Sequence, residues 1–198
     1  MKILFAVIGA FALWSAYNGF ASRERKHPAG QIAPDAPLQR NFENGRPFTI
    51  KDFTLTPRAK FTLTARVLAS ERYRTDAGAD ISPIDIAFGW GPMSDSSLLS
   101  RLKISQSGRF YHWHYKDPLP VSHDVIIRSS ANMHLIPAHS SVKDKLYGVR
   151  IGDVVELEGE LVDVTRANNW RWNTSLTRED AGGGACELIY VTGVTIRN

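Results

Sequence analysis

The stretch IGDVVELEGELVDV, residues 151–164, predicts the clearest β-strand of the chain. Apolar side chains at positions 155, 157 and 161 alternate with glutamates at positions 156, 158 and 160. This period of two is typical of a strand with one face in a core and the other in water. Two of the glutamates could serve as a catalytic carboxylate pair, but adjacent like charges more often mark a solvated face. Gly159, in the middle, predicts a bend or a bulge.

Working outward from this strand, the pattern predicts a mainly β domain with two short helices. Strands are expected at residues 61–69, 83–90, 109–115 and 187–197, with a further short strand at 124–128. Helices are expected at residues 94–103 and 140–147, where serines precede apolar residues. Residues 116–140 are expected to form a long connection, broken by prolines near its start.

The element order, three strands, a helix and two strands, resembles the OB-fold over about residues 60–197. That family implies a five-stranded barrel with a short helix between strands 3 and 4. The phrase at 151–159, x-Gly-Asp-x-Val-x-Leu-x-Gly, looks like the fourth strand of many such barrels. The helix near 96–103 and the 116–140 connection depart from the minimal pattern. The run from Asn132-Met133-His134 to Trp170–Cys186 also looks like a family of small membrane-anchored or exported proteins of Gram-negative bacteria, a likeness that implies no activity.

The N-terminus predicts membrane targeting. Residues 3–21 are apolar except for Ser15 and Asn18, which suits either a signal peptide or a transmembrane helix ending at residue 21. Residues 22–46 are punctuated by Pro and Gly and predict a linker, followed by a domain at 47–198. The expected location is the bacterial inner membrane with the domain on the periplasmic side. The basic residues at 23, 25 and 26 favour the alternative, a cytoplasm-facing domain.

The charge distribution argues against nucleic acid as a partner. The chain of 198 residues carries a net charge of +4. Residues 22–60 hold eight basic against four acidic residues, whereas residues 61–198 hold fifteen against sixteen. A domain that tracks phosphates would carry its positive charge on the fold itself. The single cysteine, Cys186, does not identify a redox compartment.

The loop of residues 168–184 carries the leading candidate binding site. Its indoles and guanidinium groups offer flat apolar surface and forked donors, which suit a glycan or a protein ligand. The alternative is that the tryptophans fold back and plug the barrel mouth. The predicted binding residues are Trp170, Arg171, Trp172 and Arg178 of this loop, with Trp90, Tyr111 and Trp113 extending the surface.

Two weaker patterns suggest chemistry. His112 and His114 lie two apart on one strand face and could share a metal, although a bare His-x-His more often lines a sheet. Cys186 could form a nucleophile–base pair with His134 or His139, oriented by Asn132 or Asp180, although a lone thiol usually packs as a small apolar group.

The sequence therefore predicts a membrane-tethered, non-enzymatic binding module of the bacterial envelope. Its partner would be a protein or a glycan, and no cofactor is expected. The alternative is an envelope hydrolase that uses a His-bound metal or the thiol of Cys186. The membrane contact would run through residues 3–21.

Overall fold

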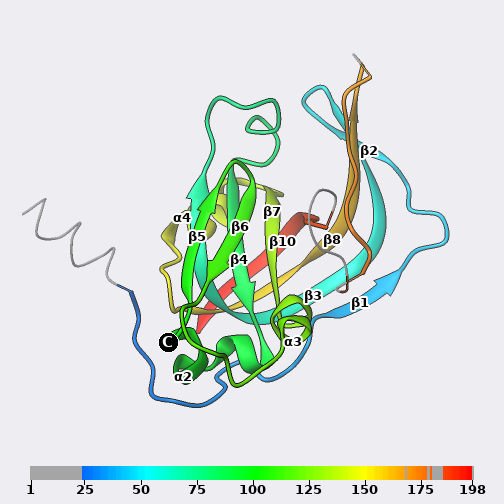
Figure 1. Cartoon of the computed structure of the whole chain (residues 1–198). Coiled ribbons are helices and arrows are strands. Elements are labelled where there is room, and N and C mark those ends of the chain that lie inside the picture. The colour runs from blue at the N-terminus through cyan, green and yellow to red at the C-terminus, as the bar shows by residue number, and fades with distance from the viewer. Residues whose placement is uncertain (1–23, 168, 178, 180–184, 198) are drawn as a thin grey trace, which may run out of the picture.

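The computed structural model describes residues 24–167, 169–177, 179 and 185–197 (Figure 1). The predicted apolar helix lies outside these residues. No helix within them is long and apolar enough to span a bilayer. The elements are β1 (Leu38–Asn41), β2 (Phe48–Ile50), β3 (Phe53–Arg72), β4 (Ile84–Gly89), the 3-10 helix η1 (Gly91–Ser94), α2 (Ser96–Leu99), β5 (Lys103–Ser107), β6 (Phe110–His114), α3 (His123–Arg128), β7 (Ser130–Pro137), α4 (Ser140–Gly148), β8 (Val154–Arg166), β9 (Arg171–Trp172) and β10 (Glu187–Arg197).

Five strands of the described chain pair into a closed ring in the order β3-β4-β7-β10-β8, and β8 pairs back onto β3. All these pairings are antiparallel except β7 with β10, which is parallel. The long, bent β3 makes closure possible because it pairs with β8 along most of its length and with β4 at its end. The mainly β prediction is confirmed.

The interior of the ring holds the principal core. It includes Phe61, Leu63, Phe88, Leu135 and Leu157, each at most 3% exposed. The alternation predicted for residues 151–164 is correct, since positions 155, 157 and 161 are buried and the three glutamates are not. Gly159 is required by a close approach rather than by a bend of its own strand: a Cβ there would lie 2.2 Å from the carbonyl oxygen of Tyr190. The neighbouring bulge lies on β10, between Val191 and Gly193.

The third strand of the ring was assigned wrongly from the sequence. Residues 109–115 contain β6, which pairs only with β5 in a separate two-stranded sheet. The ring strand is β7, inside the expected 116–140 connection, and residues 124–128 belong to α3. The helix expected at 94–103 is present but shorter: α2 covers Ser96–Leu99, residue 94 ends η1, and residue 103 already begins β5. The pattern of β7 gives no alternation because both of its faces are buried, with Asn132 and His134 on the outer one.

Two smaller layers cover the outside of the ring. The β5–β6 hairpin lies against the ring (Figure 1). Its Ile104, Tyr111 and Trp113 pack on a cluster that includes Ala87 and Ile126. Trp170 and Trp172, on and beside β9, pack on a second cluster that includes Phe53, Ile136 and Leu188. The polar side chains of β4 and β7 lie between these two layers.

The described part of the expected linker, residues 24–46, is fastened along the domain. Arg25 donates its backbone N–H to the carbonyl of Ile151 over 2.8 Å. Ala33 is 1% exposed, and β1 pairs with β3. These contacts are tertiary, and the Pro and Gly pattern of the segment gives no sign of them.

Candidate functional site

A cavity of about 380 Å³ opens on the outer side of the ring beside β7. It lies where three segments meet: the tip of the β5–β6 hairpin, β7, and the chain between β8 and β10. Its lining residues are Arg109, Phe110, His134, Arg171, Trp172, Asn173 and Cys186. The structure thus brings together four residues predicted from the sequence: Arg171, Trp172, His134 and Cys186.

His134 lines this cavity, and a buried carboxylate lies behind its ring. Asp85 of β4 and His134 of β7 are cross-strand partners, 0% and 3% exposed. Nδ1 of His134 lies 2.9 Å from Oδ2 of Asp85, although the pair lacks the alignment of a good hydrogen bond. A carboxylate oxygen this close to a bare ring nitrogen would be repelled, so we assign a proton to Nδ1. In the neutral ring, Nε2 then remains an acceptor.

Arg109 connects the hairpin tip to the same carboxylate. Gly108 and Arg109 have φ values of +57° and +72°, as the two central residues of a type I′ hairpin turn require. For Arg109 this left-handed backbone is a strained conformation. Its guanidinium donates to Asp85 over 2.8 Å and to both oxygens of Asp76. Four further contacts fix it: its N–H donates to the Tyr73 hydroxyl, its carbonyl accepts from Asn132, and its guanidinium lies over the rings of Tyr73 and Trp172.

The electrostatics of the cluster follow from this arginine and from burial. Burial alone would raise the pKa of Asp76, but the hydrogen bonds from Arg109 and from the backbone of Gly78 outweigh it, and the pKa is lowered. Burial raises the pKa of Tyr73, against the opposing hydrogen bond from the Arg109 backbone. The cluster therefore favours an ionised Asp76 and a neutral Tyr73 phenol.

The loop tryptophans are half-buried and serve the packing as well as the cavity wall. The ring of Trp170 lies edge-on to two other rings: its centroid is 5.7 Å from that of Phe53 and 5.9 Å from that of Trp172. Trp172 also lies 4.6 Å from the imidazole of His134. Gly78 leaves room for its indole, because a Cβ there would lie 2.5 Å from that ring. Arg171 is exposed, and Arg178 lies outside the described residues.

The other residues predicted for the binding surface lie elsewhere. Trp90 is 3% exposed in the principal core, so it is not a surface residue. Tyr111 packs beneath the hairpin and its hydroxyl shares a hydrogen bond of 2.9 Å with Ser130. Trp113 covers the same cluster and stacks on Tyr115. Tyr111 and Trp113 therefore stabilise the packing of the hairpin on the ring, because large aromatic side chains bury much apolar surface.

The histidines proposed for metal binding do not gather. His112 and His114 are exposed on β6, opposite Ser105 and Lys103. Within the part of the chain that the structure describes, no three His, Cys, Asp or Glu side chains are grouped as metal ligands. His139 is exposed at the start of α4, where its Nδ1 shares a hydrogen bond with Ser141, and it does not line the cavity of Cys186. Asp180, one of the two expected orienters, lies outside the described residues, and the amide of Asn132 is bonded to Arg109.

Sequence reasoning missed Asp85, Asp76, Arg109 and Tyr73. One signal was available for Asp85, the only charged residue in the otherwise apolar run PIDIAFGW. A charge inside such a strand needs a buried partner. The dipeptide Gly108-Arg109 follows a serine between two strand-like stretches, which is a hairpin turn signal. Nothing in the sequence places Asp76 or Tyr73 beside that turn.

The arrangement offers two kinds of chemistry. The guanidinium of Arg171, the partly neutralised guanidinium of Arg109 and the indole of Trp172 can hold an anionic group next to a flat one. A thiol and an imidazole line the same cavity, with a carboxylate behind the imidazole, which is the order of groups that activates a nucleophile. Comparison of the chain with protein-family models, curated proteins and solved structures finds no match.

Proposed function

We propose that this protein is a membrane-tethered, non-enzymatic binding module of the bacterial envelope that holds an acidic group of a protein or glycan partner. The observation that carries the proposal is the cavity of about 380 Å³ that joins Arg171, Trp172 and Arg109. The tether would be residues 3–21, with the domain on the periplasmic side of the inner membrane.

An OB-like barrel is the finer description of the fold that this proposal uses. The strand order β3-β4-β7-β10-β8 with the parallel pair β7–β10, and α4 between β7 and β8, support it. Such folds bind ligands on the face of their second and third strands, between the loop after strand 1 and the loop before strand 5. If β3 is strand 1, the face of strands 2 and 3 carries Asp85 and His134. The loop after strand 1 carries Tyr73 and Asp76, and the segment before strand 5 carries Trp172 and Cys186. The candidate cavity coincides with that face.

The cavity chemistry favours an anion over a neutral ligand. Arg171 is exposed and lines the cavity. Among the described residues, no carboxylate forms an ion pair with it. Arg109 is committed to Asp76 and Asp85, so it orients the site more than it adds net charge. An acidic group on Arg171 with a sugar or aromatic face on Trp172 would satisfy both.

Titration of the full chain with soluble acidic glycan fragments and with acidic peptides, measured by isothermal calorimetry, tests this function. We expect Arg171→Gln to weaken binding roughly tenfold, since a charge-assisted hydrogen bond is lost. Arg40→Gln removes the same charge from exposed β1, away from the cavity, and should leave binding unchanged. Equal binding by Arg171→Gln and the unmodified chain in both ligand classes would contradict the proposal.

A second candidate function is hydrolysis through Cys186. The specific observation is that Cys186 and His134 line one cavity, with Asp85 at Nδ1 of His134. In this reaction the Cys186 thiolate attacks an ester carbonyl, and the leaving alcohol takes its proton from the imidazolium. Water then hydrolyses the thioester with His134 as base. Mass spectrometry of the full chain after brief exposure to activated esters should show an acyl group on Cys186 that His134→Ala prevents. An unmodified Cys186 under these conditions would remove the hydrolase from consideration.

A further inference from the structure

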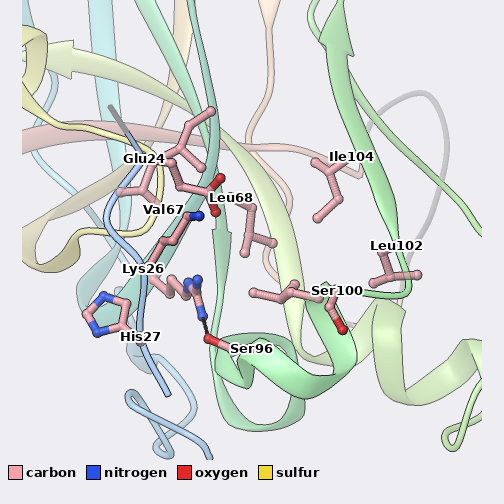
Figure 2. Close-up of a pocket in the computed structure, with 12 residues that line it drawn as sticks. Glu24, Lys26, His27, Val67, Leu68, Ser96, Ser100, Leu102 and Ile104 are labelled. Carbon is pink, nitrogen blue, oxygen red and sulfur yellow. Dashed lines mark hydrogen bonds between the residues drawn. The ribbon is translucent and has the colours of Figure 1, made fainter. Parts of the chain in front are cut away.

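A second cavity, of about 460 Å³, lies where the chain enters the described domain (Figure 2). One wall is made by Glu24, Lys26 and His27, and the opposite wall by α2 and the start of β5. It lies at the other end of the β5–β6 hairpin from the cavity of Cys186. Its volume is within the range of small-molecule sites, about 300 to 1,000 Å³.

The entry of the chain is fixed beside this cavity. Three interactions hold it on the turn before β8: the backbone of Arg25 bonds Ile151 over 2.8 Å, the His27 ring bonds the carbonyl of Gly152 over 2.8 Å, and the Arg25 guanidinium pairs with Asp153 over 2.7 Å. Glu24 follows the last apolar residue, Ala21, by three positions. At most about 10 Å of extended chain separates the two. Any surface that holds residues 3–21 is therefore within reach of the cavity.

The cavity contains a buried cation whose hydrogen-bond partners are neutral. Arg66 of β3 is 4% exposed, and its Nη1 donates to the carbonyl of Ser94 and, over 2.7 Å, to the hydroxyl of Ser96, where Figure 2 draws the dashed line. Burial lowers the pKa of Arg66, while the more distant carboxylates of Glu24 and Asp95 raise it. No described carboxylate lies within ion-pair distance of Arg66. A guanidinium withdrawn from water in this way favours an anion brought from outside.

The wall opposite the charged residues is largely apolar, apart from the hydroxyl groups of Ser96 and Ser100. Leu68, Leu102 and Ile104 face the cavity across from the charged wall (Figure 2), and Leu99 completes the surface. These side chains belong to the hairpin layer and are themselves buried or half-buried. A ligand of the cavity must therefore combine one negative group with an aliphatic body.

We propose that this cavity binds a free long-chain fatty acid, with its carboxylate on Arg66 and Lys26 and its chain along Leu68, Leu102 and Ile104. The lining holds two cations, Arg66 and Lys26, against one carboxylate, Glu24, so its net positive charge selects the carboxylate of the ligand. The apolar wall selects the alkyl chain. This site is independent of the proposed function, since it shares no residue with the cavity of Cys186.

The test is photolabelling of the full chain in phosphatidylcholine vesicles that contain a long-chain fatty acid with a diazirine in its tail. We expect adducts within residues 96–104, reduced roughly tenfold by Arg66→Gln through loss of a charged hydrogen-bond partner. The corresponding fatty alcohol should label this region much less. Absence of adducts in residues 96–104, or equal labelling by the alcohol, overturns the proposal.

A second pair of variants does not depend on the buried arginine. Ser100 is exposed and lines the cavity, so Ser100→Trp should block the alkyl chain and abolish labelling without unfolding the domain. Ser97 is exposed in α2, three residues before Ser100, but does not line the cavity, so Ser97→Trp is the matched control with unchanged labelling. Labelling that persists in Ser100→Trp overturns the proposal even if Arg66→Gln fails to fold.

Discussion

Asp85 is a fully buried carboxylate that meets two other side chains, Arg109 and His134. Removing one partner of a buried pair leaves the other charge without compensation, and this costs more than the pair contributes. We expect Asp85→Asn to lower the free energy of unfolding by about 3 kcal/mol, measured by urea denaturation. Asp76→Asn is the control: its side chain is 39% exposed, so water screens the change and the loss should stay below about 1 kcal/mol. Equal losses for the two variants would show that burial of Asp85 does not determine how much its charge contributes to the free energy of unfolding.

Tyr111 gives a pH-dependent prediction at the same scale. Burial raises the pKa of Tyr111 from its ordinary value of 10.0 to about 12, against the hydrogen bond to Ser130. The folded state therefore disfavours the phenolate, so this contribution is complete below pH 10 and is lost as the pH rises from about 10 to about 12. Two units correspond to about 2 to 3 kcal/mol. Across this range the unfolding free energy of the unmodified chain should fall by this amount relative to that of Tyr111→Phe, which has no phenol to ionise. A constant difference would contradict the assignment.

At the scale of elements, the turn before β8 holds the N-terminal segment. Gly152 has a φ of +90°, and a Cβ there would lie 2.0 Å from the backbone oxygen of Arg25. Gly152→Ala therefore introduces both backbone strain and a clash with main chain that cannot move aside cheaply. We expect a loss of more than about 2 kcal/mol and faster hydrogen exchange at residues 25–33.

Gly148 is the matched glycine for this experiment. It ends α4, is exposed, and a Cβ there would meet no atom within 4 Å. Gly148→Ala should leave exchange at residues 25–33 unchanged. If the two alanine variants behave alike, the segment is not held by the Gly152 turn.

At the scale of the whole molecule, residues 24–46 belong to the folded unit. They contribute the buried Ala33, the strand pairing of β1 with β3, and the contacts of Arg25 and His27 with the turn before β8. We expect a chain that begins at residue 24 to melt at the same temperature as the full chain. A chain that begins at residue 47 should melt several degrees lower, because a loss of 1 kcal/mol moves the melting temperature of a domain of this size by about 2 to 4 °C. Calorimetry of the two truncated chains measures the difference in melting temperature. Equal melting temperatures would show that residues 24–46 are a spacer that does not stabilise the domain.

Local sequence determined those parts of the protein whose pattern is complete within one segment. The mainly β character, the alternation of residues 151–164 and the helix at 140–148 follow from periodicity and turn chemistry. Trp172, His134 and Cys186 line one cavity, but nothing in the local sequence brings them together.

Tertiary structure decided whatever depends on two distant segments. β7 shows no period because both its faces are buried, and its polar residues find partners on β4, β5 and the Arg109 turn. Trp90 and Trp170 have the same local preference for apolar surroundings, yet one is buried in the ring and the other lies half-buried outside it. At Gly152 and Gly159 the close approach of main chain, from Arg25 and from Tyr190, is a requirement that only the tertiary structure shows. The alternation of side chains along a strand reflects which of its faces is buried and which is exposed to water. Contacts between strands depend on closure of the ring, which no single segment encodes.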